Sequence, residues 1–270
     1  MMYTSSRHLR LPLRLRGQMP FVLPGEISLM PIREFRPMTK PLLNALLRRL
    51  LDSALALALI LLLGPLLLTI AILIRVTSRG PLFYCQKRVG RGGQLFDICK
   101  FRTMLPQAEH LGPSVTSSDD ARVTPVGRYL RHTKMDELPQ LWNVIRGDMS
   151  LVGPRPQVPR LVDCFDPARR DIVLHVRPGI TGPTALRFRR EESLLAGKAD
   201  REGFYITQIL PAKLEMDVRY VQTRSLSGDL RILTQTAWLF SFAPLRWAIH
   251  KARQQKSHRR AERGALQPFQ

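Results

Sequence analysis

The sequence contains little negative charge. Its 270 residues include 21 Asp and Glu against 42 Lys and Arg, which gives a formal net charge of +21. An excess of this size favours an anionic partner, such as nucleic acid, a phosphorylated small molecule or an anionic lipid. The length allows one large domain or two small ones.

Cysteine and histidine are scarce, and neither occurs at a metal-binding spacing. The three cysteines, Cys85, Cys99 and Cys164, form no CxxC pair, and the six histidines form no HExxH motif. We therefore expect neither a structural nor a catalytic zinc. The cysteines fit a reducing compartment, or buried positions as small apolar side chains, better than a disulfide framework.

Aromatic residues are few as well, at 7% of the chain. A nucleic-acid-binding protein would need clustered aromatic side chains for base stacking, or a recognition motif, beside its basic charge. The sequence shows neither, so we expect no nucleic-acid partner. This leaves phosphorylated small molecules and anionic lipid as the partners that the charge favours.

One long apolar run is present, Ser53–Ile74, with 22 residues and no charge. As a straight helix it would be about 33 Å long, just enough for a hydrocarbon core of about 30 Å. It begins too far into the chain for a cleaved signal peptide. Gly64 and Pro65 lie at its middle, where proline removes a hydrogen bond and predicts a kink.

The flanks of this run give no preferred orientation, because five basic residues lie on each side of it. Two interpretations follow. The run is either a kinked transmembrane helix, or a helix that breaks at Gly64-Pro65 and returns to the side it entered from. In the second case, each half is long enough for one leaflet. The residues alone do not choose between the two.

Beyond the apolar run, short elements are predicted. Residues 81–90 and 94–103 resemble strands separated by "RGG", which indicates a β-hairpin. Thr124 and Pro125 are a good N-cap and first residue for a helix. Stretches 158–165, 203–223 and 226–240 also resemble helices, and "RPGITG" (177–182) resembles a turn.

The stretch "HTKMDELPQLWNVIRGDMSLVGPRP" (132–156) carries two adjacent carboxylates in a basic chain. A helix is predicted to start at Asp136 and end at Gly147, with one apolar face. The members of that face are Leu138, Leu141, Trp142 and Ile145.

The acidic pair has two readings. Asp136 has an ordinary explanation as a helix cap. A helix start also binds phosphate and keeps an aspartate ionised, as a nucleophile requires. Glu137 beside it is a suitable ligand for Mg²⁺.

Together, "KFRTM", residues 122–156 and "RPGITG" resemble the bacterial sugar transferase family, the monotopic phosphoglycosyl transferases. The resemblance runs from about Leu43 to Trp238, with the motifs in the family's order and spacing. It implies transfer of a sugar-1-phosphate from a nucleoside diphosphate sugar, a UDP-sugar in our reading, to polyprenyl phosphate. Such a reaction starts exopolysaccharide, O-antigen or related glycan assembly.

The resemblance also implies roles for individual residues. Asp136 would be the nucleophile that holds a covalent phosphosugar, and Glu137 would help to bind Mg²⁺. Gly64 and Pro65 would form the break of a re-entrant membrane helix. The residues that it implies in substrate binding are Arg88, Lys100, Arg102, Pro154, Arg155 and Pro156. Arg131 is a further candidate for substrate binding, as a positive partner for a phosphate.

The implied fold is mostly α-helical with a short β-hairpin, monotopic in the bacterial inner membrane, with a catalytic domain on the cytoplasmic face. We divide the chain into a flexible basic extension (1–39), a membrane-embedded helix-break-helix (40–78), a transferase domain (79–245) and a basic tail (246–270). One departure is clear. Many members continue "PGITG" with a Gln-x-Asn-Gly-Arg-like run, whereas this chain reads "PGITGPTALRFRREESLL".

Overall fold

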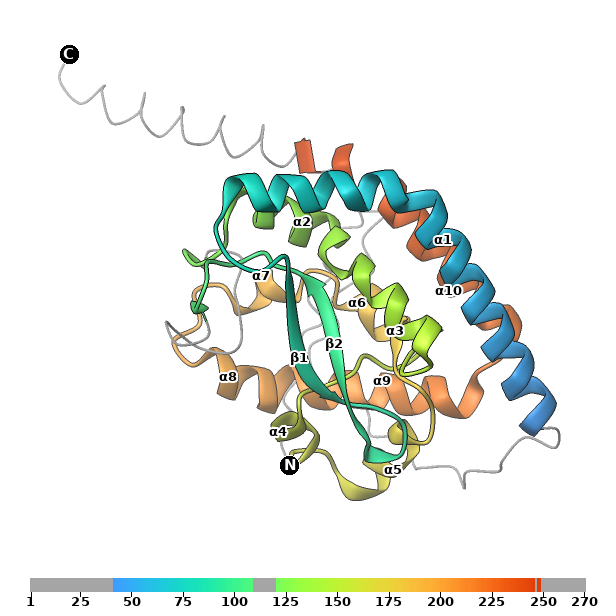
Figure 1. Ribbon diagram of the computed structural model, residues 1–270. Coiled ribbons are helices and arrows are strands. Elements are labelled where there is room, and N and C mark those ends of the chain that lie inside the picture. The colour runs from blue at the N-terminus through green and yellow to red at the C-terminus, as the bar shows by residue number, and fades with distance from the viewer. Residues whose placement is uncertain (1–40, 109–119, 246, 249–270) are drawn as a thin grey trace, which may run out of the picture.

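The computed structural model describes residues 41–108, 120–245 and 247–248 (Figure 1). The extension 1–39 and nearly all of the tail 246–270 lie outside the described residues. The fold is mostly helical with a short antiparallel hairpin, as predicted. The helical elements are α1 (Pro41–Thr77), η2 (Arg91–Gly93), α2 (Pro125–Thr133), η4 (Met135–Gln140), α3 (Leu141–Arg146), α4 (Pro159–Val162), α5 (Pro167–Leu174), α6 (Pro183–Arg187), α7 (Glu191–Leu195), α8 (Arg201–Phe204), η5 (Tyr205–Ile209), α9 (Leu210–Thr223) and α10 (Leu226–Ser241). The strands are β1 (Phe83–Val89), β2 (Leu95–Phe101), β3 (Ser150–Val152) and β4 (Gly179–Thr181).

Helix α1 contains the apolar run. Among the described residues it is the one helix long and apolar enough to cross a membrane, and only 11% of its most apolar stretch is buried. The predicted break at Gly64-Pro65 is not an interruption, because α1 continues through Pro65 as a single helix. Proline removes one backbone donor without ending the helix. Figure 1 shows α1 changing direction near the middle of its length.

Both halves of α1 pack on the rest of the protein. Ala56, in the first half, belongs to an apolar cluster with α3 and β3 that includes Val144 and Leu151. Ile70 and Ile74, in the second half, belong to another cluster with the end of β2 and with α2. A third cluster joins α4, α5, α7 and α9 and contains no residue of α1. The long helix is therefore attached to the rest of the protein at two separate places.

Strands β1 and β2 form the predicted hairpin. The register pairs Cys85 with Cys99, and the two form a disulfide. This corrects our expectation that the cysteines would be reduced or buried as apolar side chains. The reason is geometric: the turn around Gly92 places the two residues directly opposite each other on neighbouring strands, where Cβ atoms are close. Cys164 is free and exposed.

The segment "RPGITG" is not a turn, which corrects a second expectation. Its residues Gly179–Thr181 form β4, which pairs in parallel with β3. The two backbones approach so closely that a Cβ on Gly179 would lie 2.0 Å from the nitrogen of Gly153. A Cβ on Gly153 would lie 2.6 Å from the carbonyl oxygen of Arg177. Glycine is therefore needed at both positions, and the contact fixes where the loop after β3 begins.

The helix predicted from Asp136 to Gly147 is present in two parts. Its first part is the 3-10 helix η4, which begins one residue earlier, at Met135. Helix α3 follows and ends at Arg146, with Gly147 as a C-cap in a left-handed conformation (φ 97°). Thr124 caps α2 as predicted, because its hydroxyl accepts from the Gly127 nitrogen at 2.9 Å. The predicted apolar face is not fully buried: Trp142 is 60% exposed.

Candidate active site

Asp136 and Glu137 lie in the first turn of η4, directly after α2. Lys134 joins the two elements with a left-handed backbone (φ 61°), an uncommon conformation for a residue with a side chain. η4 packs against β2 of the hairpin. The sharp turn at Lys134 therefore places Asp136 and Glu137 next to the hairpin.

Asp136 is buried, with 5% of its surface exposed. The N-cap of η4 is Lys134, so Asp136 lies in the first turn of η4 and not at the capping position that the sequence predicted. Within the part of the chain that the structure describes, its Oδ1 has no hydrogen-bond partner. Buried polar atoms are nearly always paired, so an unpaired oxygen indicates a place for a ligand, an ion or water.

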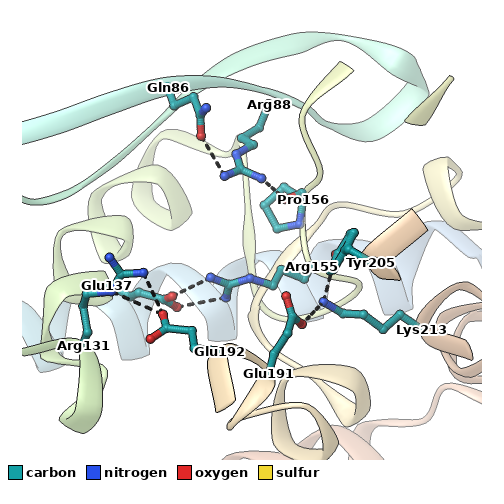
Figure 2. A network of polar contacts seen from close by, with 10 residues as sticks. All are labelled: Gln86, Arg88, Arg131, Glu137, Arg155, Pro156, Glu191, Glu192, Tyr205 and Lys213. Atoms are coloured by element: carbon teal, nitrogen blue, oxygen red, sulfur yellow. Dashed lines mark hydrogen bonds and ion pairs between the residues drawn. The ribbon is translucent and has the colours of Figure 1, made fainter. Parts of the chain in front are cut away.

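Glu137 has the opposite surroundings, because both of its oxygens are paired with Arg155. Nη1 of Arg155 donates to Oε2 at 3.0 Å and Nη2 donates to Oε1 at 2.5 Å. A guanidinium and a carboxylate in this fork arrangement form one of the strongest ion pairs in proteins. The pair joins η4 to the loop that follows β3, as Figure 2 shows.

The two carboxyl groups differ in acidity for these reasons. Burial raises the pKa of Asp136 to about 6, and the charge of Glu137 adds to the increase. Burial would also raise the pKa of Glu137, but the charge and hydrogen bonds of Arg155 outweigh it and hold that pKa well below its usual range. Glu137 is thus a fixed anion, while Asp136 titrates close to neutral pH.

A small hollow that opens to solvent lies between the hairpin and the loop after β3, next to the Glu137–Arg155 pair. Arg88, Lys100, Arg155 and Pro156 are among its lining residues, as are Tyr84 and Gln86. Burial lowers the pKa of Lys100, and the charges of Asp136 and Glu137 oppose that effect. Burial also lowers the pKa of Arg88, to about 10. The hollow is lined by cations and suits an anionic ligand.

Arg88 is held in place by two contacts. Its Nη1 donates to the carbonyl oxygen of Pro156 at 3.2 Å, and its Nη2 donates to Oε1 of Gln86 at 2.7 Å (Figure 2). Pro154 acts through its backbone, because its carbonyl oxygen accepts from the Gly179 nitrogen at 2.8 Å. The two prolines therefore hold the loop that carries Arg155 between β1 and β4.

Of the two other predicted residues, one lies near the dyad and one does not. The positive charge of Arg131 is among those that lower the pKa of Asp136. Arg102 instead donates from Nη2 to the carbonyl oxygen and the hydroxyl of Ser78, at 2.8 and 2.7 Å. Arg102 therefore ties the end of β2 to the end of α1, and the structure does not bring it to the dyad.

Four further residues complete the surroundings of the site, and the sequence did not single them out. Glu192 binds Arg131, Glu191 binds Lys213, and Lys213 also donates to the hydroxyl of Tyr205 (Figure 2). Glu191 and Glu192 lie in the stretch that departs from the family pattern. Two adjacent acids within that basic stretch, "RFRREESLL", were the only signal available.

The chain is similar to known proteins over most of its length. Residues 43–242 match the family model described as bacterial sugar transferase. A UDP-N-acetylgalactosamine-undecaprenyl-phosphate N-acetylgalactosaminephosphotransferase of Aeromonas hydrophila is 40% identical over 180 residues, which are 65% of this chain and 39% of the relative. A UDP-glucose:undecaprenyl-phosphate glucose-1-phosphate transferase of Caulobacter vibrioides is 40% identical over 179 residues, which are 65% of this chain and 62% of the relative.

The exopolysaccharide production protein ExoY of Sinorhizobium fredii is 36% identical over 189 residues, which are 64% of this chain and 76% of the relative. The chain spans less than two thirds of the length of the first two relatives, at 39% and 62%. The family model covers the dyad, the hairpin, the loop after β3 and most of α1. The chain therefore belongs to the bacterial sugar transferase family.

Proposed function

We propose that this protein is a membrane-anchored phosphoglycosyl transferase. It moves a sugar-1-phosphate from a nucleoside diphosphate sugar, a UDP-sugar in our reading, to polyprenyl phosphate. The observation that carries the proposal is the presence of two adjacent carboxyl groups in different surroundings. Asp136 is buried and its Oδ1 has no partner among the described residues, whereas Glu137 is fixed by Arg155. The names of the relatives, which act on UDP-sugars and undecaprenyl phosphate, support the substrates.

The reaction takes place in two displacements at one phosphorus atom. A carboxylate oxygen of Asp136 attacks the β-phosphorus, the bond from that phosphorus to the bridging oxygen breaks, and the nucleoside monophosphate leaves. The sugar-1-phosphate is then bonded to Asp136. A phosphate oxygen of polyprenyl phosphate attacks the same phosphorus and releases the carboxylate. The covalent step divides a difficult transfer between anions into two easier ones.

The basic side chains around the hollow reduce the repulsion between these anions. Arg88, Lys100 and Arg155 line it, and Arg131 lies close enough to affect the acidity of Asp136. Phosphoryl transfer depends mostly on positioning and on charge stabilisation of the phosphoryl oxygens, which fixed cations supply. The burial of Asp136 also removes water that would compete for the phosphorus.

The same residues fit a Mg²⁺ ion. Mg²⁺ is commonly bound by one or two carboxylates together with substrate phosphates. The unpaired Oδ1 of Asp136 and the adjacent Glu137 supply these carboxylates. Because Arg155 occupies one lone pair on each oxygen of Glu137, the remaining lone pairs would be those available to the ion. When bound, Mg²⁺ supplies neutralisation of the diphosphate charge.

The membrane placement that we propose is re-entrant, with both ends of α1 on the cytoplasmic face of the inner membrane. Support comes from polar contacts at the two ends of the helix. Near its start, Arg49 donates to the Ile145 carbonyl oxygen at 2.6 Å and Asp52 accepts from the Ser150 hydroxyl. At its end, Ser78 accepts from Arg102. Both sets of contacts are with the same part of the chain, which supports a placement of both ends on one side of the membrane.

The direct test is release of nucleoside monophosphate from a sugar nucleotide by the purified full chain in detergent or nanodiscs. We expect release and lipid-linked product with wild type and polyprenyl phosphate, and neither with Asp136→Asn. A screen of sugar nucleotides in the same assay identifies the donor. Wild-type protein that consumes no sugar nucleotide in the presence of Mg²⁺ and polyprenyl phosphate would contradict the proposal.

A further inference from the structure

Helix α7 begins with two adjacent glutamates that bind different basic side chains. Nε and Nη2 of Arg131 both donate to Oε1 of Glu192, at 3.3 and 2.8 Å. Nζ of Lys213 donates to Oε2 of Glu191 at 2.5 Å. Arg131 belongs to α2 and Lys213 to α9. The acidic pair therefore connects α2 to α9 on the side of the site opposite the hairpin, as Figure 2 shows.

The Lys213 contact fixes the position of α7. Lys213 is only 4% exposed, and its Nζ also donates to the hydroxyl of the buried Tyr205 at 3.1 Å. Burial alone would lower the pKa of Lys213, but Glu191 and Tyr205 outweigh burial and raise it. A buried ammonium requires an anion held in good geometry. Glu191 is that anion, so the start of α7 has little freedom to move.

The Glu192 contact then fixes the orientation of Arg131, which lies close to the site. Arg131 reaches Glu192 with two of its nitrogens, so the plane of its guanidinium is set and not only its charge. Arg131 lies in the last turn of α2, and α2 packs against η4, which carries Asp136. The hydrogen bonds thus link Lys213 to Glu191, and the neighbouring Glu192 to Arg131, which precedes Asp136 by five residues.

We propose that Glu192 is a positioning residue that orients Arg131 beside the nucleophile, with Glu191 and Lys213 holding α7 for that purpose. The assignment rests on the proposed function. It gives a role to the segment after Gly182, whose sequence departs from the Gln-x-Asn-Gly-Arg-like run of many family members. An arginine that stabilises transferring phosphoryl oxygens must be in place before reaction, and a misplacement of about 1 Å costs up to about a hundredfold in rate.

The test compares three substitutions of Glu192 in the full chain, with nucleoside monophosphate release as the readout. Glu192→Ala removes both contacts to Arg131, and we expect kcat/KM to fall about tenfold or more. Glu192→Gln keeps an oxygen at the same reach, and we expect a loss of no more than about threefold. Glu192→Asp keeps the charge but shortens the side chain, and we expect it to be less active than Glu192→Gln.

A matched control is available in Glu202, which pairs with Arg160 at 2.5 Å. The side chains of the two glutamates are similarly exposed, at 29% for Glu202 and 33% for Glu192, whereas Arg160 is more exposed than Arg131, at 61% against 15%. We expect Glu202→Gln to retain wild-type kcat/KM. A melting temperature for each variant separates loss of activity from loss of fold.

A double-mutant cycle shows whether Glu192 acts through Arg131. If it does, Arg131→Ala combined with Glu192→Ala is no slower than Arg131→Ala alone, because the guanidinium that Glu192 orients is already absent. Folded Glu192→Ala within twofold of wild type, losses that multiply in the cycle, or Glu192→Asp more active than Glu192→Gln would each overturn the assignment. If Glu192→Ala does not fold, the comparison of Gln with Asp decides. A wild type that releases no nucleotide overturns the proposed function itself, and this assignment with it.

Discussion

Arg155 donates to both oxygens of Glu137, at 3.0 and 2.5 Å, and this pair gives the two neighbouring carboxylates different roles. Glu137 remains ionised because the guanidinium outweighs burial, and its pKa is held well below the usual range. Asp136, one residue earlier, has no such partner, and burial raises its pKa. The same two-residue motif thus contains one permanently charged group and one group that titrates.

We expect Arg155→Lys to lose about a hundredfold or more in kcat/KM, although it keeps the positive charge. A lysine offers one point charge and does not reproduce the fork that holds both oxygens of Glu137. The measurement is steady-state nucleoside monophosphate release. Arg160→Lys, at a surface ion pair, is the control and should retain wild-type activity. A lysine variant within tenfold of wild type would show that the fork is not needed.

The pH dependence follows from the raised pKa of Asp136, about 6 in the free protein. The carboxylate is the nucleophile and is present above this pKa, so kcat/KM should rise as the pH increases through about 6 and then level off. Glu137, whose pKa is well below the usual range, adds no further change between pH 5 and 8. A profile of kcat/KM from pH 4.5 to 8.5 measures this. A rate that stays flat down to pH 4.5 would contradict it.

Glu137→Gln should raise the Mg²⁺ concentration needed for half-maximal rate more than it raises KM for the donor. An amide oxygen is a weaker ligand than a carboxylate for a hard cation. Titrations of Mg²⁺ at saturating donor, and of donor at saturating Mg²⁺, separate the two effects. If the Mg²⁺ titration is unchanged, Glu137 serves only to hold Arg155.

The placement of α1 can be tested by labelling in cells. Single cysteines at residues 42 and 79, in a chain whose three native cysteines are changed to serine, should both resist a membrane-impermeant thiol reagent in intact cells. Both should react once the inner membrane is opened. We expect Pro65→Leu, which favours a straight helix, to move the residue-42 site to the periplasm in some molecules and to lose activity in proportion. Labelling of the unaltered residue-42 site from outside would establish a transmembrane helix instead.

The features that the sequence predicted are those with local causes. The hairpin, the start of α2 at Thr124 and the end of α3 at Gly147 each depend on residues within one turn or strand. The Cys85–Cys99 disulfide was within reach of the same reasoning, because both residues are seven positions from Gly92 at the hairpin turn. A hairpin with its turn at Gly92 has a register that pairs Cys85 with Cys99.

The features that the sequence did not predict depend on distant partners. The "RPGITG" segment is a strand only because β3 lies beside it, and glycine there serves close approach rather than a turn. Arg102 follows Lys100 by two positions, but β2 ends between them and Arg102 turns to Ser78. Glu192 is 61 positions from Arg131, and no local pattern indicates that they pair.

The central claim is that Asp136 forms a covalent bond to phosphorus, and the most direct test is to trap that state. Wild-type protein incubated with sugar nucleotide and Mg²⁺, without polyprenyl phosphate, is digested at acidic pH and analysed by mass spectrometry. We predict that the peptide containing Asp136 gains the mass of one sugar-1-phosphate less water, that nucleoside monophosphate is released in the same amount, and that Asp136→Asn does neither. If wild-type protein releases nucleotide only when the lipid acceptor is present and no peptide carries the adduct, transfer is direct and Asp136 is not the nucleophile.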